Sequence, residues 1–351
     1  MSRLVDDLVW LIGTRSVTGE EEALCTAIAR RLSARWGADG LVRVGNAIVV
    51  GRPDDRPLLT LYGHLDTVPE QGNAVPEVRD GRVHGLGAVD MKGGVAVMLA
   101  LLDDDEVAAG PYAVAAVFYD REEGPADENG LEDVLHAVPW LEDARFAVVL
   151  EPSDRQIQLG CQGAINATVT FLGRSAHSAR PWLGENAVSK AGEFLAELHR
   201  REPVPVIVDG LEFKETATIT TAHAGLARNV IPSRFDLNLN YRFPPSLTLE
   251  EAEVRVRAIA AAADEVTIVD RAPAAPIPSG DPHLERLQRV SGLPRAAKQA
   301  WTDVARLTAR GIPAVNFGPG ETALAHRPDE SVAIDDLEAV HAGLRRFLLE
   351  A

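Results

Sequence analysis

The chain is poor in cysteine, and this limits the kinds of site it can build. Cys25 and Cys161 are its only cysteines, they lie far apart, and neither belongs to a C-x-x-C pair. A disulfide framework or a thiolate zinc site therefore has no support. Any bound metal must be held by histidine and carboxylate.

Positive charge is also scarce. Lys and Arg total 35 against 52 Asp and Glu, which gives a formal net charge of −17. This charge opposes binding to polyanions, and the sequence has no cluster of basic residues with interleaved aromatics to offset it. We therefore expect no nucleic-acid partner.

Long hydrophobic runs are missing as well. No run approaches the length of a membrane span, and residues 1–24 carry two aspartates inside their apolar stretch instead of the layout of a signal peptide. We expect a cytoplasmic protein with no membrane partner. With 351 residues, 46% of them hydrophobic and 25% charged, the chain is long enough for two soluble domains.

The first 160 residues alternate short apolar, β-branched runs with helical patterns. This rhythm predicts an α/β domain with a mainly parallel central sheet, in which chemistry gathers at the carboxyl ends of the strands. The apolar runs occupy residues 47–52, 58–64, 93–102, 112–120 and 146–152.

From about Ala164 the pattern changes to a β-α-β-β-α-β order over roughly a hundred residues, which is typical of a ferredoxin-like α+β module. The Pro-rich segment 271–282 then leads back to a helical pattern and a buried strand. We therefore expect an insertion. The predicted domains are 1–163 with 273–351, and 164–272.

Side chains that can bind metal occur at five places, mostly at or after the ends of predicted strands. Because an α/β fold brings most of these ends to one edge of one sheet, the side chains are expected to meet. Imidazole and carboxylate without thiolate form the ligand set of a catalytic zinc or a similar divalent ion. The five places are His64 with Asp66, Asp90, Glu122 with Glu123, Glu151, and His326.

Taken singly, each place also has an ordinary structural explanation. The first pair can end a strand in a turn, and the two adjacent glutamates can be solvated charges before a Gly-Pro turn. Asp90 can be the N-cap of the helix that follows it. Glu151 and His326 can belong to surface loops.

Taken together, the motifs resemble, in order and spacing, the dinuclear zinc aminoacylase and carboxypeptidase family of metallohydrolases over essentially the whole chain. They are G-H-L-D-T-V-P, G-x-G-x-x-D-M-K-G-G, E-E-G, L-E-P, G-R-x-A-H-S-A-R-P-x-x-G-x-N-A and A-H-x-x-D-E. The resemblance implies a zinc-hydrolase catalytic domain, with the insertion acting as a lid and dimerisation domain of a homodimer. It also implies two Zn²⁺ per subunit, although the ligand chemistry permits Co²⁺ or Mn²⁺.

The same resemblance implies a role for each candidate ligand. Asp90 bridges the two ions. His64 and Glu151 bind one of them. Glu123 and His326 bind the other.

Further residues take catalytic roles by the same resemblance. Glu122 is the general base and acid, and Asp66 orients the imidazole of His64. His177 stabilises the tetrahedral oxyanion of the other subunit's active site. Arg121 departs from the family pattern, because an acid is common there, and it puts a positive charge near Glu122.

The resemblance also indicates positions that contact substrate. Arg180, Asn229 and Arg242 match these positions, and arginine suits carboxylates because its guanidinium is a planar fork. Gly318 and Gly320 lie in a Gly-rich stretch that either offers backbone N–H groups to a carboxylate or forms only a turn.

The metal motifs indicate hydrolysis of an amide bond and carry little information about the acyl group. By the resemblance, the substrate is a small N-acylated amino acid that carries carboxylates. Aminoacylases, acetylornithine deacetylases, dipeptidases and succinyl-diaminopimelate desuccinylases share the metal motifs, so specificity must be read elsewhere. The runs around residues 117–124, 150–187 and 228–245 most resemble the desuccinylases of the actinobacterial kind. The alternatives are an acetylornithine deacetylase, another N-acyl-amino-acid amidohydrolase, or a non-catalytic relative that keeps the fold.

Overall fold

The computed structural model describes residues 2–350, which form two compact units. The first unit runs up to Leu159 and also contains Pro278–Ala296 and the chain from Arg306 on. The second unit contains Gly160–Ile277 and Ala297–Ala305. Residues 160–163, 273–277 and 297–305, which were predicted to belong to the catalytic domain, thus group with the second unit.

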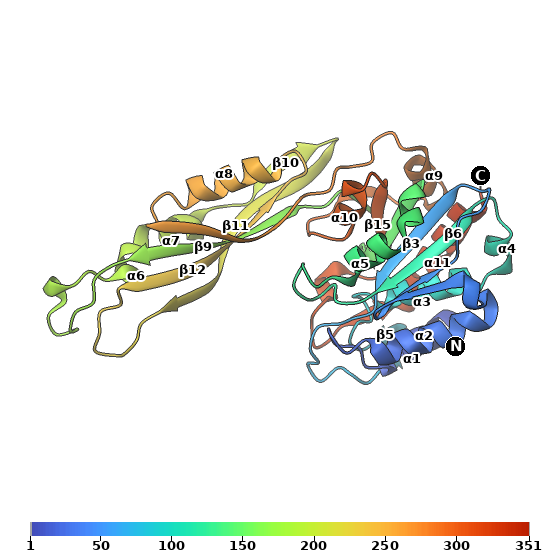
Figure 1. The fold of residues 1–351 in the computed structure, drawn as a ribbon, viewed down its shortest axis with the longest axis horizontal. Coiled ribbons are helices and arrows are strands. Elements are labelled where there is room, and N and C mark those ends of the chain that lie inside the picture. The colour runs from blue at the N-terminus through green and yellow to red at the C-terminus, as the bar shows by residue number, and fades with distance from the viewer. Residues whose placement is uncertain (1, 351) are drawn as a thin grey trace. The chain divides into compact units, whose positions relative to one another are not determined.

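An eight-stranded sheet forms the centre of the first unit, in the order β1-β2-β6-β3-β7-β15-β8-β14 (Figure 1). The neighbours β6, β3, β7 and β15 are parallel, which confirms the predicted α/β class. Its strands are β1 (Leu41–Val44), β2 (Ala47–Val50), β3 (Leu58–His64), β6 (Ala113–Tyr119), β7 (Phe146–Pro152), β8 (Ile157–Leu159), β14 (Arg295–Ala297) and β15 (Ala314–Gly318).

Every residue of β3, β6, β7 and β15 is buried, as expected of parallel strands with both faces covered. A small antiparallel sheet consists of β4 (Glu77–Arg79), β5 (Arg82–His84) and β16 (Ser331–Ala333). The helices are α1 (Arg3–Gly13), α2 (Glu22–Trp36), α3 (Lys92–Leu102), α4 (Asp105–Ala108), α5 (Gly130–Ala137), α9 (Pro282–Ser291), α10 (Val304–Ala309), which begins in the second unit, and α11 (Ile334–Leu349), with short 3₁₀ turns η1 (Ala38–Gly40), η2 (Pro139–Asp143) and η4 (Thr322–Leu324).

The second unit is a five-stranded antiparallel sheet in the order β10-β11-β12-β9-β13 with helices α6, α7 and α8. The elements are β9 (Gly163–Leu172), η3 (Pro181–Leu183), α6 (Ala187–Lys190), α7 (Gly192–Arg200), β10 (Val204–Val208), β11 (Leu211–Ala224), β12 (Arg234–Phe243), α8 (Leu249–Ile259) and β13 (Glu265–Ala272).

Strand β10 was not predicted from the sequence. Pro205 lies inside it, and proline cannot donate to a sheet ladder, so the segment looks unlike a strand. The structure accommodates Pro205 because β10 is at the edge of the sheet. The first helical segment of this unit is divided, since Ala191 separates α6 from α7.

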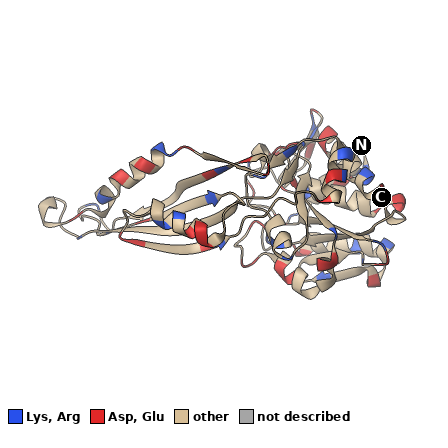
Figure 2. Cartoon of the chain, turned by 90° about the horizontal axis from the view of Figure 1, so that it is seen from above, with Lys and Arg blue, Asp and Glu red and all other residues tan. Residues whose placement is uncertain are grey.

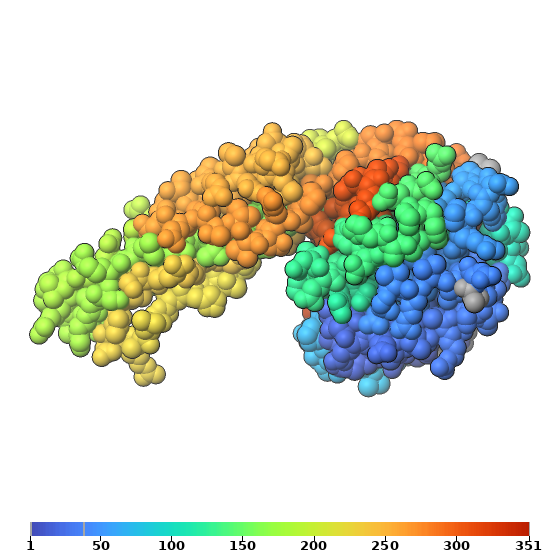
Figure 3. Space-filling view, in the orientation of Figure 1, coloured from blue at the N-terminus to red at the C-terminus, as the bar shows by residue number. Residues whose placement is uncertain are grey.

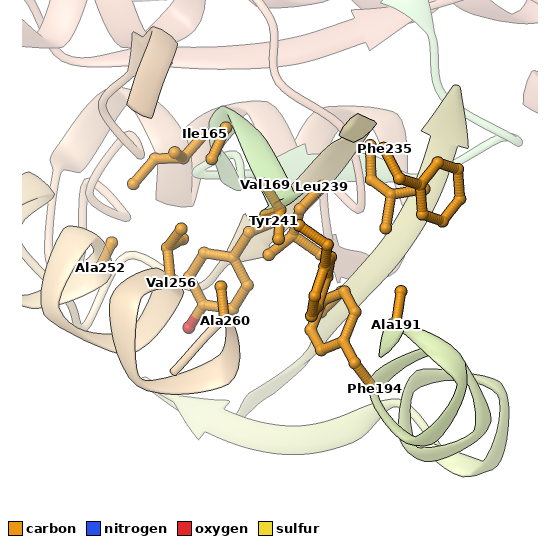
Figure 4. Packing of buried hydrophobic residues seen from close by; sticks show 14 of the residues in the cluster. Ile165, Val169, Ala191, Phe194, Phe235, Leu239, Tyr241, Ala252, Val256 and Ala260 are labelled. Carbon is orange, nitrogen blue, oxygen red and sulfur yellow. The ribbon is translucent and has the colours of Figure 1, made fainter. Parts of the chain in front are cut away.

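The core of the second unit lies between its sheet and its helices (Figure 4). Phe194 of α7 and Val256 of α8 pack against apolar residues of β9 and β12, including Tyr241. The rings of Phe171 and Phe194 lie 5.5 Å apart between centroids. Because the core contains residues from all these elements, the unit has an apolar interior of its own.

Acidic and basic residues are interspersed over both units (Figure 2). Helix α8 shows the usual arrangement, with Glu250 and Glu251 in its first turn and Arg257 in its last. None of the helices within residues 2–350 combines the length and hydropathy needed to cross a bilayer.

Candidate metal centre

Three neighbouring parallel strands bring polar side chains to one edge of the first unit's sheet. His64 is the last residue of β3 and is fully buried. Glu151 lies near the end of β7, and Glu122 follows the end of β6. Since β3 pairs in parallel with both β6 and β7, the three strand ends share one edge.

Asp90 lies at the centre of this group, between two histidines. Its Oδ1 is 3.1 Å from Nε2 of His64, and its Oδ2 is 3.4 Å from Nε2 of His326. Nε2 of His64 is also 3.6 Å from Oε1 of Glu151. Nε2 of His326 is 2.7 Å from Oε1 of Glu123. The two oxygens of one carboxylate therefore face two separate sets of ligand atoms.

The donor set fits two divalent cations. His64, Asp90 and Glu151 offer one ligand atom each within 4.8 Å of one another, and so do Asp90, Glu123 and His326. We call these five residues the metal cluster. Its nitrogen and oxygen donors and its excess of carboxylates over imidazoles suit zinc or a related ion.

The excess of carboxylates over imidazoles also shifts the pKa values of the two histidines in the metal cluster. Burial alone would lower the pKa of His64, but hydrogen bonds to Asp66 and Asp90 raise it well above its ordinary value. Asp90 and Glu123 raise the pKa of His326 to about 11. Burial raises the pKa of Glu123. The carboxylates thus favour positive charge at this place, and bound cations would supply it.

Asp66 fixes several parts of the site at once. Its main-chain oxygen lies 3.0 Å from Nδ1 of His64, which leaves Nε2 turned to the metal cluster. Its carboxylate accepts the backbone N–H groups of Glu122 and Glu123, both at 3.0 Å, and the hydroxyl of Thr18 at 3.0 Å. Asp66 thus positions the loop that carries both glutamates as well as the histidine.

Glu122 is half-buried beside the cluster, and it forms another group of possible ligands with His64 and Glu123. The preceding Arg121 has its Nε 3.7 Å from Oδ2 of Asp120, so Asp120 balances part of the positive charge that the sequence places near Glu122.

One alternative explanation of Asp90 was wrong. The sequence allowed Asp90 to be the N-cap of the following helix, but α3 begins at Lys92 and its N-cap residue is Met91, without a side-chain cap. The Asp90 carboxylate faces His64 and His326 instead.

The second unit carries the remaining polar candidates. His177 forms an isolated bridge with Val230, and the N–H of Ser178 donates to the carbonyl of Asn229 at 2.9 Å. These contacts join the loop of His177 and Arg180 to the loop of Asn229, and all three side chains are exposed. Arg242 comes from β12, half-buried, and donates from Nε to Oδ1 of Asn240 at 3.0 Å.

The two glycines near residue 320 have protein partners for their N–H groups. Gly318 N donates to Ser153 Oγ at 3.3 Å, and Gly320 N donates to Asp336 Oδ2 at 2.8 Å. A Cβ at Gly318 would lie 2.0 Å from the carbonyl oxygen of Leu150, so glycine is required there by close packing against β7. Contact of these glycines with a substrate stays a prediction.

Sequence reasoning missed two residues that support the metal cluster. Lys92 is 2% exposed, and its Nζ donates to the carbonyls of Leu11 and Thr14 at 3.0 Å each, which ties α3 to the end of α1. Glu330 accepts backbone N–H groups from the segment that leads to Asp90. Lys92 lies in the motif G-x-G-x-x-D-M-K-G-G and Glu330 in the motif A-H-x-x-D-E, so their place in these motifs was the only sequence signal for a supporting role.

Curated proteins align with this sequence over most of its length. A Corynebacterium glutamicum protein named succinyl-diaminopimelate desuccinylase is 37% identical over 300 residues, which cover 83% of this chain and 80% of the relative. A Mycobacterium tuberculosis (strain ATCC 25618 / H37Rv) protein named "Putative succinyl-diaminopimelate desuccinylase DapE" is 36% identical over 341 residues, which cover 96% of each chain.

Solved structures share the fold at low sequence identity. Aminopeptidase PepT from Bacillus cereus aligns with a TM-score of 0.78 and 19% identity, covering 99% of this chain and 97% of that one. YXEP from Bacillus subtilis, described as a dinuclear metal-binding peptidase, aligns with a TM-score of 0.68, 16% identity and the same coverage. The family described as peptidase family M20/M25/M40 matches residues 60–350. With this match over most of its length and relatives above 30% identity, the chain belongs to the M20/M25/M40 peptidase family.

Proposed function

We propose that this protein is a two-metal amidohydrolase that converts N-succinyl-LL-2,6-diaminopimelate to succinate and LL-2,6-diaminopimelate. The observation that carries the reaction class is Asp90, whose two oxygens face separate sets of histidine and carboxylate donors. The choice of substrate rests on the names of the curated relatives.

We propose that Asp90 bridges two ions, most simply Zn²⁺. His64 and Glu151 complete one site, and Glu123 and His326 complete the other. When bound, such ions would polarise the amide carbonyl and lower the pKa of a bound water toward neutrality.

The chain's own residues then move the protons. Glu122 takes a proton from the attacking water, and the C–N bond breaks as Glu122 returns a proton to the leaving amine. Asp66 supports this role because its carboxylate holds the N–H of Glu122 at 3.0 Å and so fixes the loop that presents the base. His177 is proposed to donate a hydrogen bond to the oxyanion.

Binding of the substrate carboxylates is assigned to the second unit. Arg180 and Arg242 provide cationic groups, and Asn229 lies beside the His177 loop. A substrate with three carboxylates requires several such donors. The half-buried Arg242, oriented by Asn240, is suited to one fixed contact, whereas the exposed Arg180 can adapt.

We further propose a homodimer formed through the second unit, which serves as lid and dimerisation domain. In support of this, large apolar side chains are exposed on its edge strands β10 and β13 and on α8. The segment of α8 and β13 forms much of the face of this unit turned to the viewer (Figure 3). The exposed residues are Val204, Ile207, Val254 and Val269.

Steady-state hydrolysis tests the substrate. Zinc-loaded protein is assayed with N-succinyl-LL-diaminopimelate and, separately, with N-acetylornithine, beside metal-stripped protein. We expect a strong preference for the succinyl substrate and loss of turnover on chelation. Preference for N-acetylornithine would instead identify a deacetylase. If neither substrate is hydrolysed while two zinc ions remain bound, both substrates are excluded.

A further inference from the structure

The carboxylate of Glu330 is surrounded by backbone donors. Its Oε1 accepts the N–H of Val89 at 2.8 Å and of Asp90 at 3.1 Å, and its Oε2 accepts the N–H of Gly87 at 3.0 Å. The main-chain oxygen of Glu330 accepts a fourth N–H, that of Gly85, at 3.1 Å. Glu330 is only 2% exposed, so these bonds are shielded from water.

From this arrangement we propose that Glu330 is a positioning residue of the metal site. Its carboxylate holds the segment 85–90 in the conformation that turns the two oxygens of Asp90 toward separate ions. The inference rests on the proposed two-metal function, and it adds a residue outside the proposed set of metal ligands. Residues that orient metal ligands in this way contribute strongly to metal affinity.

The segment 85–90 needs an acceptor of this kind. It is neither helix nor strand, and Gly85 and Gly87 have φ values of +146° and +78°. Its N–H groups therefore lack the partners of a regular element, and a buried N–H without a partner is strongly disfavoured. One carboxylate with two oxygens satisfies three of them, so the ordering of the loop depends on Glu330.

The position of Glu330 in the chain also connects both halves of the metal cluster. It follows His326 by four residues and immediately precedes β16, whose Ser331 pairs with His84 of β5. The segment that supplies His326 is thereby joined to the segment that supplies Asp90. A change at Glu330 is expected to disturb both ions.

The substitution Glu330→Gln tests this with little change in shape. The amide has one oxygen, so either the N–H of Gly87 or the pair from Val89 and Asp90 must face an NH₂ group. Asp329→Asn is the matched control, because Asp329 is exposed in the same segment and pairs with Arg327. Glu330→Asp, which keeps the charge but shortens the side chain, serves if the glutamine variant does not fold.

Two readouts separate positioning from general folding. Hydrogen exchange of the metal-free, folded chain is expected to speed up in the peptide covering residues 85–91 of Glu330→Gln, with other regions unchanged. Zinc affinity, measured by competition with a chromophoric chelator, is expected to fall about 10- to 100-fold, with a lower kcat and little change in KM. Asp329→Asn should match the wild type in all of these.

Each result decides the matter. If folded Glu330→Gln keeps wild-type exchange in residues 85–91 or wild-type zinc affinity, the positioning role is wrong, even if thermal stability falls. If the wild type binds two ions but hydrolyses no substrate, the proposed substrate falls while a loss of affinity in Glu330→Gln still supports the inference. If the wild type binds no divalent ion, both proposals fall.

Discussion

The two units hold their candidate residues in different ways. In the first unit His64 and Asp66 are fully buried and contact residues from distant segments. In the second unit His177, Arg180 and Asn229 are exposed, and the hydrogen bonds around them join main-chain groups of two adjacent loops. The fold of the first unit thus holds its candidate ligands through buried contacts between distant segments, whereas the three exposed side chains of the second unit lie on loops that are joined to each other through their main chains.

The largest effect is expected from Glu122→Gln in the first unit. The glutamine keeps the shape but cannot take a proton, so kcat should fall about 10²- to 10⁴-fold while zinc content stays unchanged. Steady-state kinetics and metal analysis of the same preparation measure both. Glu128→Gln, an exposed position in the same loop, is the control, and near-normal turnover by Glu122→Gln would remove the proposed base.

His177→Ala tests the second unit's contribution to catalysis. Loss of an oxyanion donor is expected to lower kcat about 10²- to 10³-fold without affecting zinc affinity. His199→Ala, an exposed histidine of α7, should behave like the wild type.

The same variant tests whether His177 acts on the other subunit of the proposed homodimer. After subunit exchange, an equal mixture of His177→Ala and Glu122→Gln should regain about a quarter of wild-type activity, because half of the dimers then have one intact site of two. No recovery after demonstrated exchange would show that His177 does not act on the partner's site.

Asp66→Asn is expected to have a smaller effect, within the first unit. The asparagine amide cannot accept the N–H groups of Glu122 and Glu123 with both of its polar atoms, so the loop of the base should loosen. Zinc affinity or activity should fall about 10- to 100-fold, measured by chelator competition and kinetics. Asp80→Asn, an exposed residue with φ 51° that asparagine tolerates, is the control.

The smallest effect on the metal site is expected from the core of the second unit. Phe194→Ala removes a buried ring that packs on Phe171, which should destabilise this unit by about 3–5 kcal/mol. Zinc affinity should remain at the wild-type value. Urea denaturation, monitored with one spectroscopic probe in each unit, measures the stability, and chelator competition measures the zinc affinity. A loss of zinc affinity in Phe194→Ala would show that the metal site of the first unit depends on the core of the second.

The fold and the grouping of metal-capable residues could be anticipated where simple patterns applied. His64, Glu122 and Glu151 follow or end buried strands, and parallel strands bring such ends to one edge. His326 has a left-handed backbone, with φ 60°, in a loop outside the sheet, so only the family resemblance pointed to it.

Other features could not be read from a linear pattern. Pro205 concealed β10, because only the assembled sheet shows that this strand is at an edge. The partners of the Gly320 and Val89 N–H groups, Asp336 and Glu330, come from distant positions, so they depend on the tertiary path of loops. Local sequence carries little information about such contacts.

Metal content of the wild type beside Asp90→Asn tests the central claim most directly. We expect two tightly bound zinc ions per wild-type chain. In the variant we expect at most one, with activity lost, because a neutral amide cannot bridge two cations as a carboxylate does. One ion or none in the wild type, or two tight ions with normal turnover in Asp90→Asn, would contradict the two-metal proposal.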